Sequence, residues 1–190
     1  MSEPAIFDNA KFLKILYLGL ALIIFLPLIA SAVSTYIGRR IPNNQKAAVD
    51  FCKAYAEAQE QYRRVDHDGD RVLEYAQSLQ ELARVGLIPR EAAAAELGAP
   101  VEVPHKGYLF RVLTAQSKNA TGGARQYIVN GNMTLGYGLM GSPAVYDGTG
   151  RDTFVISNNG TIFQKDYGEL ETNQRLPTEF DPPVSGPSAE

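Results

Sequence analysis

Residues 15–38 read ILYLGLALIIFLPLIASAVSTYIG, a run of 24 residues without a charged side chain. An α-helix of this length is long enough to cross the hydrocarbon core of a bilayer, which is about 30 Å thick. Lys14 and Arg39 flank the run, and Tyr17 and Tyr36 lie near its ends, where amphipathic rings favour the headgroup layer. We therefore expect one membrane-spanning helix over residues 15–38, preceded by a cytoplasmic segment over residues 1–14.

A cleaved signal peptide is the alternative interpretation of this run. Ala30-Ser31-Ala32 has the small-x-small form of a cleavage site, and basic residues precede the apolar stretch. However, the run is longer than the apolar region of an ordinary signal peptide and continues to Ile37. The basic residues on the two sides are too similar in number to orient a span by the positive-inside rule.

The remainder of the chain has the composition of one ordinary folded domain. Residues 39–168 are enough for a single hydrophobic core of common size. The net charge of −3 and the isoelectric point of about 5.5 give no basic surface for nucleic acid. Cys52 is the only cysteine, so the sequence excludes an internal disulfide and a structural zinc site built on thiolates.

The first part of this domain has the apolar spacing of helices. Between Asn43-Asn44, which could cap a helix, and Arg64, apolar residues recur at intervals of three and four. These residues are Ala48, Phe51, Cys52, Tyr55, Ala58 and Tyr62. Ser78 and Glu81 have the spacing of a capping box at the start of a short helix that ends near Gly86. A third helical piece is expected from Pro89 to Leu97.

From Gly107 the apolar period changes to two, which is typical of strands. Strands are expected over residues 108–114, 126–135, 136–145, 153–157 and 161–165, and Asn159-Gly160 predicts a tight hairpin between the last two. Residues 169–190 are rich in proline and predict a disordered or extended tail. The expected fold class is α+β, with a long helix packed on one face of an antiparallel sheet.

Several short segments distributed over residues 44–168 resemble one known family. They are Ala58–Tyr62, Tyr75–Leu82, Gly107–Arg111, Ser142–Tyr146, Gly150–Phe154 and Gly160–Ile162. They look like the globular domain of type IV pilins and type II secretion pseudopilins, and of related bacterial envelope domains of unknown function that carry an Asp-x-Asp-Gly-Asp turn. The resemblance implies a pilin-like domain in the periplasm, held by a single span in the bacterial inner membrane.

The chain departs from pilins at the features that drive filament assembly. Pilins carry a leader ending in glycine and a glutamate early in the hydrophobic helix, and neither is present around residues 15–38. A buried carboxylate in such a helix needs a compensating partner. We therefore expect a non-enzymatic accessory subunit that contacts other membrane proteins through its span and its domain. A pseudopilin-like component of a secretion or pilus assembly is the alternative.

The sequence Asp66-His67-Asp68-Gly69-Asp70-Arg71-Val72-Leu73-Glu74 contains the one constellation that could bind an ion. Carboxylates at alternate positions of a tight turn suit Ca²⁺, and the candidate ligands are Asp66, Asp68, Asp70 and Glu74. The segment departs from an EF-hand, because glycine is in the fourth place and Arg71 is in the sixth. The alternative is a solvated turn whose aspartates cap the next helix.

Signals for catalysis are weak throughout the sequence. His67 and His105 are the only histidines, no nucleophile can be placed beside either, and no glycine-rich phosphate loop follows a strand. We expect no enzymatic activity and no cofactor apart from the possible Ca²⁺. Two further alternatives are a calcium-dependent extracytoplasmic binding module and a membrane-anchored hydrolase that uses His105.

Overall fold

The computed structural model describes residues 9–169 and 177–182, and at residues 9–12, 15, 33, 36 and 37 it describes the backbone alone. The chain divides into two compact units, Met1–Arg40 and Ile41–Glu190. Helix α1, Asn9–Tyr62, contributes to both. The expected helix over residues 15–38 is therefore present, and it is continuous with the amphipathic helix expected after it.

In the first unit, the large apolar side chains of α1 that the structure describes are exposed. Five consecutive residues, Leu22 to Leu26, have exposed fractions of 50–72%. Since a helical turn takes about 3.6 residues, these five cover the whole circumference. Over the described part of the chain, with its gaps in α1, no helix is both long enough and apolar enough to cross a membrane.

In the second unit, one stripe of α1 is buried, as its spacing predicts. The six apolar residues expected on this stripe, Ala48, Phe51, Cys52, Tyr55, Ala58 and Tyr62, are each at most 6% exposed. The expected cap at Asn43-Asn44 is wrong, because α1 continues through these residues. The side-chain amide of Asn44 instead donates to the carbonyl oxygen of Thr149 at 2.8 Å.

Two short helices follow α1. Helix α2, Leu79–Arg84, begins as expected, since the Ser78 hydroxyl accepts from the Glu81 N–H and the Glu81 carboxylate accepts from the Gln77 N–H. Helix α3, Arg90–Ala93, is shorter than expected. It ends early because Ala95 and Leu97 make backbone hydrogen bonds to Phe110.

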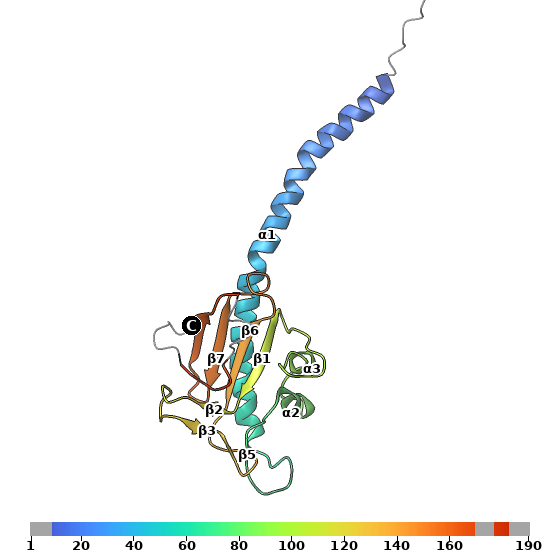
Figure 1. The fold of residues 1–190 in the computed structure, drawn as a ribbon. Coiled ribbons are helices and arrows are strands. Elements are labelled where there is room, and N and C mark those ends of the chain that lie inside the picture. Colours follow the sequence, from blue (N-terminus) through green and yellow to red (C-terminus); the bar gives the residue numbers. More distant parts are fainter. Residues whose placement is uncertain (1–8, 170–176, 183–190) are drawn as a thin grey trace, which may run out of the picture. The chain divides into compact units, whose positions relative to one another are not determined.

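The main sheet has four antiparallel strands in the order β1-β6-β7-β8. They are β1 Tyr108–Leu113, β6 Gly138–Pro143, β7 Asp152–Ser157 and β8 Ile162–Asp166, close to four of the expected strands. Figure 1 shows these strands across the second half of α1, with α2 and α3 near the β1 edge. The α+β class with an antiparallel sheet is thus confirmed.

The expected strand over residues 126–135 is wrong, because the chain folds back on itself inside this range and its first residue pairs with an earlier strand. Strand β2, Ala115–Gln116, pairs with β3, Arg125–Gln126. Strand β4, Ile128–Val129, pairs with β5, Asn132–Met133. The turn between β4 and β5 is Asn130-Gly131, with φ of +54° and +92°. Such a pair of left-handed residues is a strong hairpin signal, so this turn was readable in the sequence.

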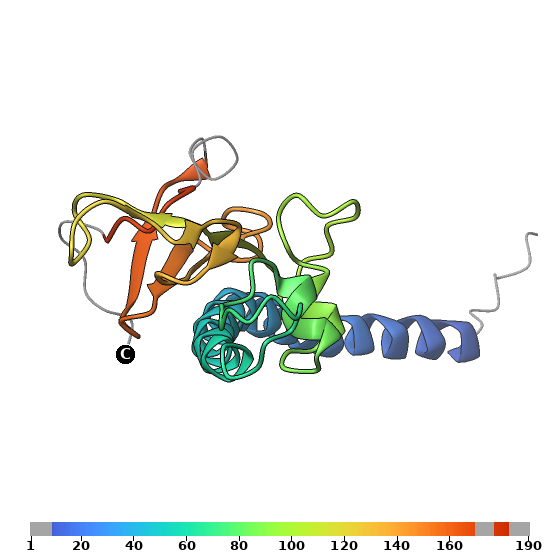
Figure 2. The same ribbon diagram turned by 90° about the horizontal axis from the view of Figure 1, so that it is seen from below.

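The sheet is covered on both faces. On the α1 face, Phe110 packs against Phe51 with ring centroids 4.5 Å apart, and this cluster extends to α2 and α3, which flank α1 in Figure 2. On the opposite face, Leu113, Met140 and Val155 form a second cluster with Phe180. Most of the expected tail, residues 169–190, lies outside the described residues. The described piece 177–182 differs from a disordered tail, because Phe180 is buried there.

Candidate functional site

The acidic turn follows directly from the end of α1, and its carboxylates organise its backbone. The two oxygens of Asp66 accept from the N–H groups of Gly69 and Arg71, at 2.7 and 2.9 Å. Asp70 accepts from the N–H of Val72 at 2.7 Å. The hydrogen bond from Gly69 is the main cause that lowers the pKa of Asp66 below its ordinary value.

The structure brings three of the four candidate ligands together. One carboxylate oxygen from each of Asp66, Asp68 and Asp70 lies within 4.8 Å of the other two. Calcium–oxygen bonds are about 2.3–2.6 Å long, so two ligands of one ion are at most about 5 Å apart. None of the three carboxylates makes an ion pair with a lysine or arginine among the described residues. The donor set therefore fits a hard cation, and its binding stays a prediction.

The fourth candidate, Glu74, is used elsewhere. Its carboxylate accepts from the backbone N–H of Met133 at 3.1 Å, beside the backbone bond from Tyr75 to the same residue. Burial raises the pKa of Glu74 above its ordinary value. Asn132 was not expected here, yet its amide donates to Asp70 from across the turn. No sequence signal links Asn132 to Asp70, since only the pairing of the turn with β5 brings them together.

The two histidines lie apart from any catalytic partner among the described residues. The ring of His67 stacks on Tyr62 at 3.9 Å, and its Nε2 is 3.0 Å from the Tyr62 carbonyl oxygen. The ring of His105 is half-buried against Phe51 at 5.6 Å, and burial lowers its pKa. A deep polar pocket around His105 would favour the hydrolase hypothesis, and a fully exposed position on a loop would exclude it. His105 is half-buried and has neither environment.

A shallow groove of about 490 Å³ runs along the C-terminal part of α1. Its lining includes Glu57, Glu60, Gln61 and Arg64, with Tyr137 beside them. Burial raises the pKa of Tyr137, and the nearby carboxylate of Glu60 raises it further. Because charges of both signs line the groove, they select no one class of ligand.

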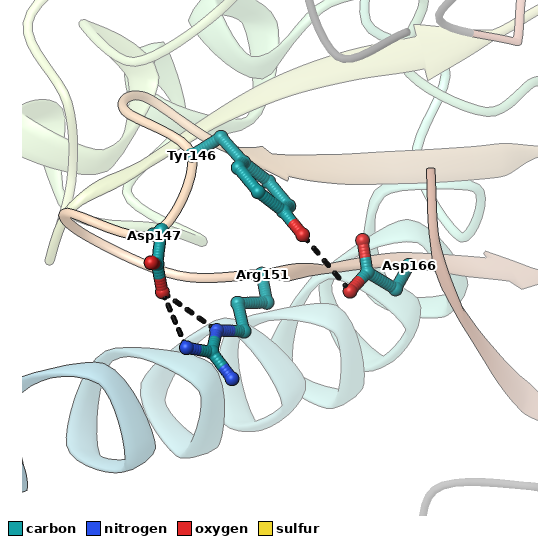
Figure 3. A network of polar contacts seen from close by, with 4 residues as sticks. All are labelled: Tyr146, Asp147, Arg151 and Asp166. Carbon is teal, nitrogen blue, oxygen red and sulfur yellow. Dashed lines mark hydrogen bonds and ion pairs between the residues drawn. The ribbon is translucent and has the colours of Figure 1, made fainter. Parts of the chain in front are cut away.

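The loop between β6 and β7 carries the polar network of Figure 3. Arg151 donates to Asp147 at 2.7 Å, and Tyr146 donates to Asp166 of β8 at 3.2 Å. The Arg151–Asp147 pair is more than half exposed on both sides, and water screens such surface pairs, so they contribute little to stability. The network therefore shapes a loop and offers no buried charge for chemistry.

The same loop is also fixed to α1 within the second unit. Gln45 donates to the Asp152 carboxylate at 2.6 Å, and the Tyr108 hydroxyl donates to the Asp152 carbonyl at 2.9 Å. Burial raises the pKa of Asp152 above its ordinary value. The first contact holds the start of β7 against α1, the second holds it against β1, and neither involves a nucleophile.

Comparison with known families places the chain in one of them. A family model described as "Protein of unknown function (DUF2950)" matches residues 29–185. The match covers well over half of the chain, so the protein belongs to this family. No curated protein and no solved structure matches the chain.

Proposed function

We propose that this protein is a non-enzymatic, single-pass membrane subunit that docks on a larger bacterial membrane complex. The observation that carries the proposal is the ring of exposed apolar side chains around the first part of α1. Leu22 to Leu26 present apolar surface in every direction, and the surrounding run from Ile15 to Gly38 has no charge. No single packed partner covers all sides of a helix, whereas a bilayer does.

The energetics of transfer support an apolar environment for this segment. Leucine, isoleucine and phenylalanine at the centre of a span each contribute about −0.3 to −0.6 kcal/mol on an insertion scale. The run contains many such residues and no charged one, so these side chains favour an apolar environment over water. In water the same surface would drive association with any available apolar partner.

The architecture of the second unit supports the docking part of the proposal. A long helix packed on a four-stranded antiparallel sheet is the arrangement that the resemblance to pilins and pseudopilins implies. By this resemblance the domain lies in the periplasm and the span in the inner membrane. Lys11 and Lys14 precede the run, and burying them inside a filament of packed stems would cost desolvation energy without a compensating partner. A single docked copy avoids this cost.

Membrane anchoring is tested by alkaline carbonate extraction. The full chain should stay in the membrane pellet, and a fragment that begins at Asn43 should be soluble and folded. A matched control replaces Leu22 and Leu26 with lysine, which should release the chain without touching the domain. Release of the unaltered chain by carbonate would contradict the anchor.

Docking is tested by capture from mild detergent followed by mass spectrometry. One partner complex should be enriched with the full chain and depleted when residues 15–38 are replaced by an unrelated apolar span. Negative-stain microscopy of the purified protein separates docking from polymerisation. Thin fibres would favour the pseudopilin-like alternative over the docked subunit.

A calcium-dependent binding module is the second candidate, and the cluster of oxygens from Asp66, Asp68 and Asp70 favours it. Extracellular calcium modules have Kd values of about 0.1–1 mM. At 10 mM Ca²⁺, mass action then stabilises the fold by about 1.4–2.7 kcal/mol. The melting temperature should rise by several degrees, and Asp68→Ala should abolish the rise while Asp50→Ala, at an exposed site on α1, should not. An unchanged melting curve for the unaltered protein would remove this candidate.

A further inference from the structure

The C-terminal segment 177–182 lies on the second face of the sheet and is bridged to β2 through one residue, Phe180. Phe180 pairs in parallel with Gln116 of β2. The Phe180 N–H donates to the Ala115 carbonyl at 2.7 Å, and its carbonyl accepts from the Ser117 N–H at 2.9 Å. Strand β2 also pairs with β3, so it carries both a two-stranded ladder and this single β-bridge.

One side chain anchors this segment. The ring of Phe180 is 2% exposed and packs among Leu113, Met140 and Val155, with the ring of Phe163 at 5.9 Å. Its neighbours Thr178, Glu179 and Asp181 are exposed. The surface formed by Leu113, Met140, Val155 and Phe163 beside β2, called the groove below, therefore buries one aromatic ring of the segment. The residues on either side of that ring lie at the surface.

A second set of contacts binds the side chain of Asp181, which follows Phe180. The carboxylate of Asp181 accepts from the Ser117 hydroxyl at 2.5 Å and from the Asn119 amide at 3.0 Å. The crevice that continues from Asp181 is lined by the cationic side chain of Lys165. Together the groove recognises an extended backbone, an aromatic side chain and a following carboxylate.

We propose that this groove is a docking site for an extended segment of a partner protein with an aromatic residue followed by an acidic one, and that residues 177–182 fill it in the isolated chain as a displaceable strap. Strand addition of this kind takes affinity from main-chain hydrogen bonds and specificity from the side-chain pocket. The strap offers two main-chain bonds and one buried ring, so a partner segment with a longer pairing replaces it.

The covalent connection of the strap protects the groove from weak competitors. A short tether gives its end an effective concentration of the order of millimolar. A free peptide of the same sequence therefore meets a groove that is mostly filled, and its apparent Kd rises in inverse proportion to the fraction of molecules whose groove is open. Removing the Phe180 side chain from the strap should open the groove without changing the residues that line it.

The test uses a fluorescein-labelled peptide of residues 176–184, LPTEFDPPV, and the full chain in detergent. Anisotropy should show saturable binding to the variant Phe180→Ala with Asp181→Ala, at least about tenfold tighter than to the unaltered chain. The peptide with alanine in place of phenylalanine should not bind. Glu179→Ala, an exposed position in the same strap, should behave as the unaltered chain does. Equal binding to the unaltered chain and the double variant, or no binding to a folded double variant, would overturn the proposal.

A cysteine pair tests the same contact if the double variant does not fold. In Ser117→Cys with Asp181→Cys the two side chains are adjacent, while Cys52 is fully buried and burial raises its pKa to about 12. Mild oxidation should give an intramolecular disulfide in a monomer and abolish any peptide binding. A covalent dimer would overturn the strap within one chain and assign the groove to a second copy. Absence of a disulfide in the folded protein would show that residues 177–182 do not occupy the groove, and would overturn the proposal.

Discussion

Replacing Gln59 with leucine should be among the most damaging single changes in the second unit. Gln59 is 0% exposed, and its amide joins the segment at Ala76 to α1. Its Nε2 donates to the Tyr55 hydroxyl at 2.7 Å and to the Ala76 carbonyl at 2.8 Å. Its Oε1 accepts from the Ala76 N–H at 2.8 Å. The side chain therefore satisfies both backbone groups of a residue that lies between α1 and α2.

Leucine fills a similar volume but leaves these backbone groups unpaired. Ala76 is 0% exposed, so neither its N–H nor its carbonyl can turn to bulk water. An unsatisfied buried polar group costs about 1–3 kcal/mol, which gives about 2–6 kcal/mol for the two. Burying an apolar side chain in place of the amide returns about 1 kcal/mol. We expect Gln59→Leu to lower the free energy of unfolding by about 3 kcal/mol, or more than 100-fold in the folding equilibrium.

Urea unfolding of the fragment 43–190, followed by far-ultraviolet circular dichroism, measures this loss. The midpoint should fall while the slope m stays constant, since the surface exposed on unfolding is nearly unchanged. Gln61→Leu is the matched control, because Gln61 is exposed on the same helix and should change stability by less than about 0.5 kcal/mol. A loss for Gln59→Leu that equals the control would refute the role of this amide.

Three further changes test other parts of the fold. Gly141→Val should cost about 2 kcal/mol or more in urea unfolding, because a Cβ there would lie 2.7 Å from the buried ring of Phe110; a loss below about 0.5 kcal/mol would mean that the ring can move aside. Arg71→Gly should stabilise the fold by up to about 1 kcal/mol, because Arg71 has a φ of +70° in the acidic turn, and a lowered urea midpoint would contradict this. Burial raises the pKa of Glu96 above 4.5, although its carboxylate accepts from the Leu79 N–H; stability from this residue is therefore greatest below pH 4.5 and falls as pH rises through the folded pKa. Glu96→Gln should remove that pH-dependent loss, and an unchanged profile of melting temperature against pH would exclude Glu96 as its source.

The helices and most strands of the second unit could be predicted because their signals are local. Phe51 and Tyr55 recur at helical spacing and face the sheet, and Ser78 with Glu81 starts α2 through backbone hydrogen bonds within one turn. The β7–β8 hairpin was expected at Asn159-Gly160, and Gly160 takes a φ of +79° there. The expected two-residue turn is wrong, because Asn159 has no positive φ and the loop runs from Ser157 to Ile162. In these cases a few neighbouring residues determine the conformation, whatever the rest of the chain does.

The errors of prediction arise where a distant segment competes with a local preference. The helix expected up to Leu97 stops after Ala93 because the chain pairs with Phe110. Asn44 does not cap a helix, because its amide binds Thr149 across the unit. The proline-rich composition around Phe180 predicts a tail, although a lone aromatic residue in a polar stretch is a signal that it can be buried.

The candidate site shows the same division. The alternation of Asp66, Asp68 and Asp70 within one turn was enough to bring their oxygens together, since each is only two residues from the next. Glu74 was expected as a calcium ligand from its spacing alone. Its carboxylate instead accepts a hydrogen bond from the backbone N–H of Met133. Asn132 reaches Asp70 only because β5 lies beside the turn.

Local features of the sequence were enough to predict the α+β class, the apolar run of α1, the buried stripe of its second half and the acidic turn. These follow from periodicity, charge and the conformational preferences of a few adjacent residues. Three features appear only in the folded domain: the strand order β1-β6-β7-β8, the hydrogen bonds between Gln59 and Ala76, and the β-bridge of Phe180 to β2. Each of these features joins residues that are far apart in the chain. Each residue has many possible partners of similar local energy, so the packing of the whole domain selects the pairs that form.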